Sequence, residues 1–225
     1  MAVDPAAHQG PDCLCLDTTP LLHFNNHGFL DNLGDLGGNP TFTAQHILDI
    51  EVRAPMQRDA RYRKNHAILK AEWLHGTALD DVEGLKRIAA LKRRLGGAPL
   101  ENMGEVHAIA LAERYGWTLV MEDEGGRLAA NDSNDGPVVP TVYMVTVLAV
   151  AAGFGQIDVD EAWRIHQTIE TPRRRSIVLP EQRDIFKAAA ETFAKLEGKV
   201  EPWPGVLSRG RTLDDLILAE SRRRR

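Results

Sequence analysis

Four acidic residues of this chain stand where one expected structural element gives way to the next: Asp17, Glu51, Glu105 and Asp123. Asp17 closes a short apolar run that starts at Cys13 and predicts a buried strand. At the strand ends of an open α/β sheet, such acids would converge on one crevice. Their mutual repulsion is relieved there only if they share a proton or a cation. The placement therefore predicts a site for a divalent metal ion.

Each of these acids also has an ordinary structural explanation. Asp17 could cap the helix that follows its strand, and Glu105 begins a helix whose dipole favours a carboxylate. Glu122 and Asp123 both follow an expected strand, so either of them could face the metal. Only the joint placement favours a metal site. Carboxylates suit Mg²⁺ or Mn²⁺, and such an ion activates a bound water for phosphodiester hydrolysis without any nucleophilic side chain.

The elements that must position these acids alternate between short apolar strands and helices, which predicts an α/β fold. A helix from Ala44 would carry Glu51 and end at Pro55. The helix that begins near Glu105 would end at Gly116 and lead into a strand with acids at its exit. Including that strand, five strands are expected, at residues 13–17, 41–43, 73–75, 117–121 and 136–140.

The motifs around the four acids resemble those of PIN-domain nucleases, particularly the toxin-type ribonucleases. In chain order they match the four acids expected of that family, and the resemblance covers roughly residues 13–170. The motifs are Leu16-Asp17-Thr18-Thr19-Pro20-Leu21-Leu22, Leu48-x-x-Glu51-Val52, and Gly104-Glu105-x-x-Ala108-Ile109-x-Leu111-Ala112 leading to Glu122-Asp123-x-x-x-Arg127.

The resemblance implies a three-layer α/β/α sandwich with a central parallel sheet of about five strands. It also implies a Mg²⁺- or Mn²⁺-dependent endoribonuclease that hydrolyses RNA. Many relatives are toxins of toxin–antitoxin modules, so an antitoxin protein and a homo-oligomer are expected as partners. The implied metal ligands are Asp17, Glu51, Glu105 and Asp123, with Glu122 as the alternative to Asp123.

The chain is longer than a minimal toxin requires, because it has an insert at residues 57–99 and a tail after Glu170. The expected division is therefore an N-terminal tail (1–12), a PIN-like domain (13–170) and a helical extension with a basic, disordered end (171–225). The alternative to a ribonuclease is a non-catalytic PIN-like module that binds protein or RNA.

Composition restricts the function further. The chain is 43% apolar and 26% charged, which is typical of a globular protein. Its net charge of −5 argues against coating duplex nucleic acid by bulk electrostatics. Two local basic faces, at residues 58–70 and 86–94, would either track RNA phosphates or be solvated helix surfaces. Cys13 and Cys15 are expected to be buried thiols rather than zinc ligands.

Several other classes are less compatible with the sequence. The longest apolar stretch, residues 142–155, is too short to cross a bilayer, and the first residues lack signal-peptide features. A cytoplasmic protein without a membrane partner is therefore expected. A phosphatase with an aspartyl nucleophile would need a second acid where Thr19 stands. Neither a P-loop nor a strand-linked GxGxxG motif occurs, which argues against a nucleotide-cofactor enzyme.

Overall fold

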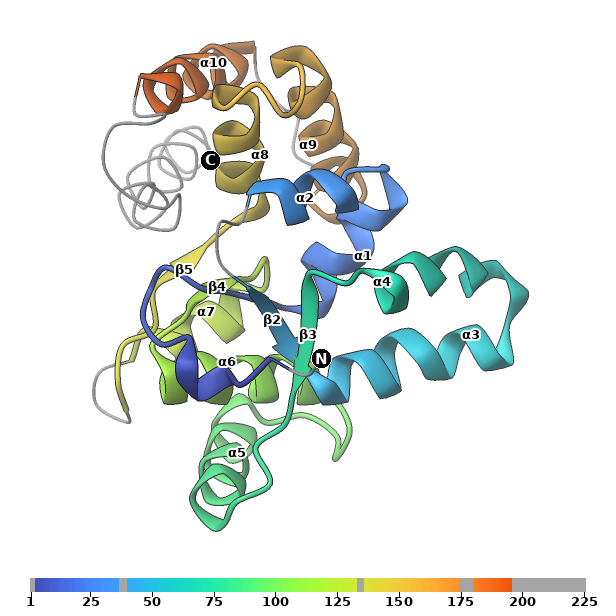
Figure 1. Cartoon of the computed structure of the whole chain (residues 1–225), viewed down its shortest axis with the longest axis vertical. Coiled ribbons are helices and arrows are strands. Elements are labelled where there is room, and N and C mark those ends of the chain that lie inside the picture. The colour runs from blue at the N-terminus through green and yellow to red at the C-terminus, as the bar shows by residue number, and fades with distance from the viewer. Residues whose placement is uncertain (1–2, 37–39, 133–135, 175–179, 196–225) are drawn as a thin grey trace. The chain divides into compact units, whose positions relative to one another are not determined.

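A parallel five-stranded sheet lies at the centre of the computed structural model, which describes residues 3–36, 40–132, 136–174 and 180–195. Helices flank this sheet (Figure 1), which confirms the predicted α/β/α architecture with five parallel strands. The sheet has the order β3-β2-β1-β4-β5, and its strands are β1 (Leu14–Leu16), β2 (Thr41–Ala44), β3 (Leu74–Thr77), β4 (Thr118–Val120) and β5 (Thr141–Val142).

The strand order places a topological switch point between β1 and β4. The chain moves outward from β1 through β2 to β3, and then returns to the other side of β1 as β4. Leu16, the last residue of β1, is in register with Thr43 of β2 and Val120 of β4. In open α/β sheets, ligands bind in the crevice at the carboxyl ends of the strands beside such a point. Asp17 follows β1 at this end.

Helix α6 (Met103–Tyr115) packs tightly against β1, β2 and β4. Ala108 and Ala112 are fully buried, and the Cys15 thiol donates to the Ala108 carbonyl at 3.7 Å. Gly116 ends the helix with a left-handed φ of 74°, and β4 follows. The predicted succession of helix, glycine, strand and acids is therefore confirmed. Cys15 and its neighbour Cys13 are free and buried, as predicted.

Residues 3–12, expected as a tail, pack against the sheet. The Trp117 indole N–H donates to the His8 carbonyl at 2.5 Å, and the Thr118 hydroxyl donates to the Pro11 carbonyl at 2.8 Å. Trp117 also stacks on Phe42 of β2, with ring centroids 4.1 Å apart. The segment, which includes the 3₁₀ helix η1 (Pro5–Ala7), therefore covers part of the core.

The helix that carries Glu51 does not end at Pro55, contrary to the prediction. It begins as a π-helix, η2 (Ile47–Arg53), and continues as α3 (Ala54–Arg58). Proline lacks an N–H and its ring collides with the carbonyl four residues earlier, which here belongs to Glu51. The wider π-turn accommodates the ring, because its hydrogen bonds span five residues instead of four. The helix therefore passes through the proline.

The predicted fifth strand at residues 136–140 is also wrong, because β5 lies just beyond it. Pro137 and Pro140 have no N–H for a ladder. The segment instead makes isolated hydrogen bonds to α7 and β4. The Val139 N–H donates to the Ala130 carbonyl at 2.9 Å, and the Leu119 N–H donates to the Pro140 carbonyl at 2.8 Å.

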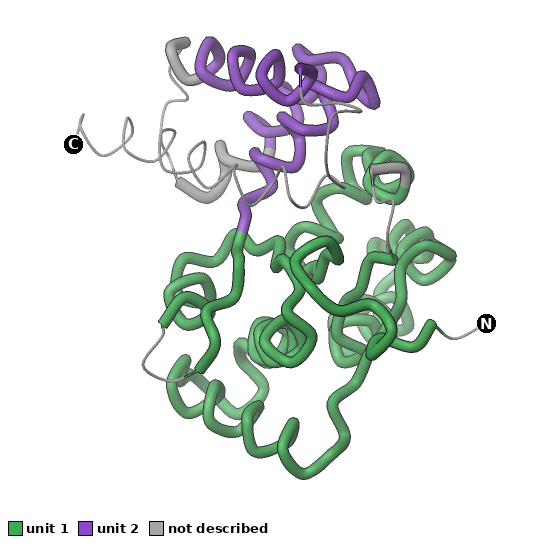
Figure 2. The backbone as a smooth tube through the Cα atoms, turned by 60° about the vertical axis from the view of Figure 1, so that its left-hand side comes forward, with its two compact units in different colours: residues 1–141 green, residues 142–225 purple. Residues whose placement is uncertain are grey.

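The contacts divide the chain into two compact units, residues 1–141 and 142–225 (Figure 2). The other helices of the first unit are α1 (Thr18–Asn26), α2 (Leu30–Leu36), η3 (Ala60–Asn65), α4 (His66–Lys70), α5 (Val82–Leu95) and α7 (Glu124–Ala130). The described part of the second unit consists of α8 (Met144–Gly153), α9 (Val159–Arg174) and α10 (Pro180–Ala194).

Within the second unit, α8 packs against both α9 and α10. A Cβ on Gly153 would lie 2.5 Å from the Ala190 carbonyl, so glycine allows the backbones of α8 and α10 to approach closely. Trp163 and Phe186 join α9 to α10, with ring centroids 5.4 Å apart. The predicted disordered basic end lies outside the described residues. None of the described helices is both long and apolar enough to cross a membrane.

Candidate metal centre

Asp17 occupies the N-cap position of α1 but makes no capping hydrogen bond with its side chain. Asp81, at the same position of α5, accepts the backbone N–H of Gly84, three residues later, at 2.8 Å. The residue three positions after Asp17 is Pro20, which has no N–H to donate. Helix capping therefore does not explain the aspartate at position 17.

The Asp17 carboxyl group is almost entirely removed from solvent, with an exposed fraction of 1%. Its Oδ1 atom has no hydrogen-bond partner among the described residues. Burial, and then the charges of Glu105 and Glu51, raise its pKa to about 8, although the nearby N–H groups of Thr18 and Thr19 oppose this. A buried oxygen without a partner is costly, and a bound cation would remove that cost.

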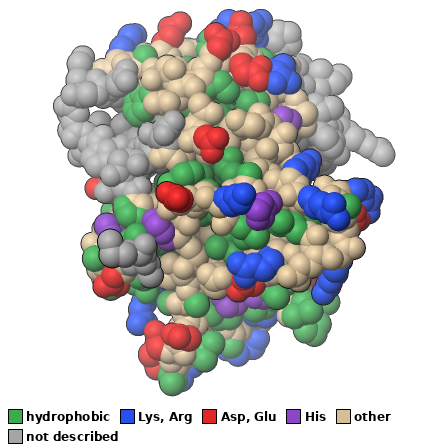
Figure 3. Space-filling view, turned by 45° about the vertical axis from the view of Figure 1, so that its right-hand side comes forward, with side chains coloured by type: hydrophobic (Ala, Val, Ile, Leu, Met, Phe, Trp, Pro, Cys, Tyr) green, Lys and Arg blue, Asp and Glu red, His purple; other side chains and the backbone are tan. Residues whose placement is uncertain are grey.

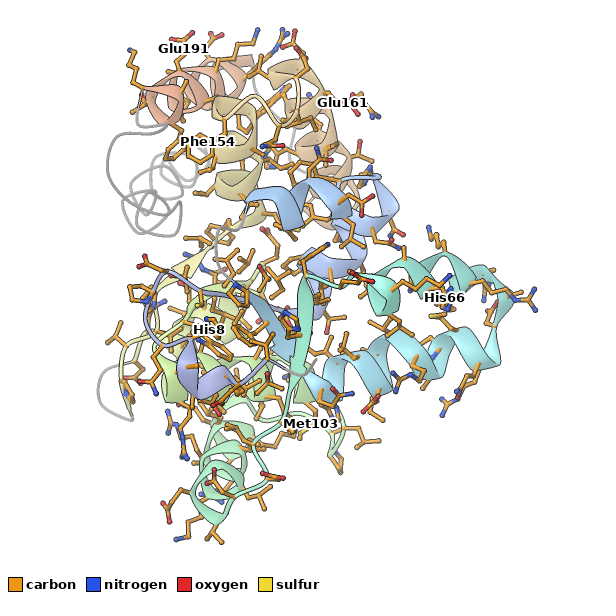
Figure 4. All side chains as sticks on the ribbon, in the orientation of Figure 1. His8, His66, Met103, Phe154, Glu161 and Glu191 are labelled. Carbon is orange, nitrogen blue, oxygen red and sulfur yellow. The ribbon has the colours of Figure 1, made fainter. Side chains whose placement is uncertain are left out.

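Glu51 extends from the π-helix η2 toward the start of α1. Its Oε2 atom accepts a hydrogen bond of 2.5 Å from the Thr18 hydroxyl. A Cβ on Gly104 would overlap Glu51 Oε1 and would lie 3.1 Å from the Thr18 hydroxyl oxygen. The absence of a side chain at position 104 therefore gives the carboxylate its room. Met103, labelled in Figure 4, marks this end of α6.

Glu105 lies in the first turn of α6 and is half-buried. Burial raises its pKa, the charges of Glu51 and Asp123 raise it further, and its own backbone N–H and Lys92 oppose the shift. Each of the four predicted acids therefore interacts electrostatically with at least one other. Exposure increases from buried Asp17, through half-buried Glu51 and Glu105, to exposed Asp123, so the cluster opens to solvent on the Asp123 side.

Of the two adjacent acids, Asp123 acts on the pKa of Glu105. Its Oδ1 atom also accepts the Gly126 N–H at 2.7 Å, so the capping explanation does hold for this residue. Glu122 is half-buried and has interactions of its own. Within the described part of the chain, no three Asp, Glu, His or Cys side chains already stand together in a metal-binding arrangement. Carboxylate oxygens suit a hard divalent cation. To bind one ion, the carboxylates of this cluster would have to move closer together.

Lys92 fixes the loop that leads into α6. Its ammonium group donates to the carbonyl oxygens of Gly96, Ala98 and Glu101 at 2.6, 2.7 and 2.6 Å. Lysine has three donors, so this arrangement uses all of them. The loop ends at Asn102, which has a left-handed φ of 57°. Lys92 therefore positions the helix end that carries Glu105.

Two imidazole rings lie on the elements that carry Glu51 and Glu105. His46 precedes η2 and stacks on His107 of α6, with ring centroids 4.8 Å apart and planes 4° from parallel. Burial, followed by the charge of His46, lowers the pKa of His107 to about 4. His107 is therefore neutral at physiological pH, and its stack with His46 joins the two helices.

Sequence reasoning missed three parts of this arrangement. Pro20 carries a readable signal, since a proline three residues after Asp17 removes one of the two N–H groups that a capping side chain usually accepts. Gly104 stands directly before a predicted acid, but its clearance for Glu51 depends on long-range packing. Lys92 gave no signal beyond its place in a basic helix. The hydrogen bond from the Thr18 hydroxyl to Glu51 also depends on long-range packing.

The predicted acids thus gather around the carboxyl ends of β1 and β4 and the first turn of α6. No protein-family model matches the chain, and neither a curated protein nor a solved structure matches it significantly.

Proposed function

We propose that this protein is a Mg²⁺- or Mn²⁺-dependent endoribonuclease. The observation that carries the proposal is the state of Asp17: a buried, uncapped carboxyl with an unpartnered oxygen among other carboxylates. The groups that lower its pKa are the N–H groups of Thr18 and Thr19, and they do not offset its burial and the charges of Glu105 and Glu51. Charge of one sign concentrated at a topological switch point favours a cation-binding function.

The proposed ligands are Asp17, Glu51, Glu105 and Asp123. When bound, the ion would supply an activated water and would neutralise charge on the scissile phosphate. In the protein alone, Asp17 holds a proton at neutral pH, because its pKa is about 8. Thr18 keeps Glu51 oriented by its hydrogen bond. The half-buried glutamates have long side chains that can close on an ion from the solvent side.

Cleavage of a mixed RNA pool tests this proposal. The full-length wild-type chain is expected to cleave RNA with Mn²⁺ and not with a chelator. Asp17→Asn and Glu51→Gln each remove a ligand charge, so each is expected to lower the rate by more than about 100-fold. Asp81→Asn is the matched control, because it changes the same side chain at another helix cap. It is expected to retain cleavage.

A second measurement separates metal binding from catalysis. Because Asp17 is protonated at neutral pH, Mn²⁺ binding is expected to release a proton and to tighten as the pH rises toward 8. Calorimetry in buffers of different ionisation enthalpy detects that proton. Wild-type protein that binds RNA without Mn²⁺-dependent cleavage would contradict the proposal and favour the non-catalytic binding module. The toxin role and the homo-oligomer stay predictions of the resemblance.

A further inference from the structure

The helices that follow η2 form a basic arm, defined here as residues 54–70. It comprises α3, η3 and α4, and in Figure 1 these helices extend to the right of the sheet as a hairpin. The arm contains five Lys and Arg residues and one acid, a net charge of +4 in a chain whose total is −5. His66, labelled in Figure 4, lies on its return leg. Positive charge is therefore concentrated on one projecting element.

The basic residues of the arm are largely unengaged. Arg61 pairs with Asp59 at 2.6 Å. The other four are exposed, and none makes an ion pair or side-chain hydrogen bond with the rest of the described chain: Arg58, Arg63, Lys64 and Lys70. Figure 3 shows separate Lys and Arg side chains spread over the face that it brings forward.

The second predicted basic face, on α5, differs from the arm. Its cations serve the fold: Lys86 pairs with Glu83, Arg87 with Glu113 and Arg94 with Asp132, while Lys92 holds three carbonyls. Arg87 is also mostly buried by its bidentate contact, with both N···O distances at 2.6 Å. On this face Arg93 is exposed and makes no ion pair with the described residues, whereas the arm has four such cations.

The arm also carries an exposed aromatic ring. Tyr62 lies between Arg61 and Arg63, its exposed fraction is 43%, and no described ring stacks on it. The arm is anchored to the rest of the first unit, because Asn65 and Ile68 are buried and the Asn25 amide donates to Asn65 and to the Lys64 carbonyl at 3.3 Å. A rigid support thus presents one aromatic face among cations, which is the combination that binds unpaired bases and their phosphates.

The root of the arm is the proposed metal centre. Glu51 and Arg58 belong to one continuous helical run, seven residues apart, which is about 10 Å along the axis. A strand held along the arm would therefore lead into the acidic cluster, whose own charge repels phosphate.

We propose that the arm binds single-stranded RNA, with phosphates on Arg58, Arg63, Lys64 and Lys70 and one unstacked base on Tyr62. This inference rests on the proposed function, because it assigns the substrate of the same site as a single strand. A duplex keeps its bases stacked inside, so it offers Tyr62 nothing to bind.

Binding of labelled RNA to the metal-free full-length chain tests the arm separately from cleavage. An unstructured oligoribonucleotide is expected to bind more tightly than a duplex of the same length. Tyr62→Leu is expected to weaken single-strand binding by roughly 5-fold to 150-fold, because one base stack is lost. Tyr62→Phe retains the ring and is the matched control, so it is expected to bind like wild type.

Changing the four cations to Gln is expected to lower the slope of log affinity against log salt by about 2.8, since four phosphate contacts are lost. Arg93→Gln on α5 controls for loss of an exposed cation elsewhere.

Equal affinity for duplex and single strand, or Tyr62→Leu that binds like wild type, would overturn the inference. Displacement of RNA by polyglutamate at equal charge would assign the arm to an acidic protein instead. Tight RNA binding that depends on Tyr62, without Mn²⁺-dependent cleavage, would support RNA binding by the arm and contradict the proposed nuclease activity.

Discussion

Asp17→Asn should stabilise the metal-free protein, and the gain should grow with pH. The folded-state pKa of Asp17 is about 8, whereas an unfolded aspartate has a pKa of about 3.9. The fold therefore binds this proton more tightly than the unfolded chain does. This bound proton contributes to the unfolding free energy. The contribution is fully present below about pH 4 and is lost as the pH rises toward 8. Asparagine has no such proton to lose.

The size of the effect follows from the two pKa values. Each pH unit between them costs the wild type about 1.4 kcal/mol of unfolding free energy. At pH 7, about three units above the unfolded pKa, the accumulated cost is roughly 4 kcal/mol. Asparagine places an amide N–H₂ where the carboxyl was, and that change adds a constant offset of about 1–3 kcal/mol. The offset does not vary with pH, so the slope isolates the carboxyl.

Urea unfolding of both proteins with a chelator, at several pH values between about 5 and 8, measures that slope. The difference in unfolding free energy should change steadily in favour of Asp17→Asn as the pH rises. Asp81→Asn gives the ordinary effect of replacing a capping carboxylate at an exposed site. Mn²⁺ should then stabilise the wild type and reverse much of the difference. If the unfolding free energies of wild type and Asp17→Asn changed with pH by the same amount, the raised pKa of Asp17 would be refuted.

Three further changes test the parts that surround this carboxyl. Gly104→Ala should lower Mn²⁺-dependent cleavage by roughly 100-fold with little loss of stability, because the new Cβ displaces Glu51 while alanine favours the helix; melting temperature and initial rate measure the two effects. Lys92→Met should cost about 2–3 kcal/mol in urea unfolding and weaken Mn²⁺ binding, because three carbonyls lose their charged donor, whereas Lys92→Arg should recover part of both. Pro55→Ala restores an N–H and removes the ring, so it should convert the π-turn to an α-helix, reorient Glu51 and lower cleavage by about 10-fold or more while helical circular dichroism is retained. Unchanged cleavage in Gly104→Ala or Pro55→Ala would contradict the role given to Glu51.

Strands β1 and β4 were predictable because they are buried on both faces. Leu14, Cys15 and Leu16 form a continuous apolar run that ends at a charged residue, and Thr118–Val120 repeats this pattern beside it. Such runs predict both the strand and the position of the acid that follows. β5 was misplaced because it contains only Thr141 and Val142, too few residues for a periodic pattern to appear.

The geometry of Glu51 was not predictable in the same way. Pro55 reads locally as a helix end, and its tolerance depends on a π-turn that the rest of the fold supports. The contact between Glu51 and Thr18 joins residues 33 positions apart, so no local pattern encodes it.

These local irregularities act on the same group of atoms. Pro20 removes one N–H that the Asp17 carboxyl could accept, and Pro55 follows the π-helix that carries Glu51. Gly104 then leaves the space that the Glu51 carboxylate occupies. Pro55 and Gly104 work against ordinary helix stability, since proline removes a backbone donor within a continuous helix and glycine adds backbone entropy. Because Pro55 and Gly104 both lie beside the Glu51 carboxylate, these two unfavourable features support the proposed cation site.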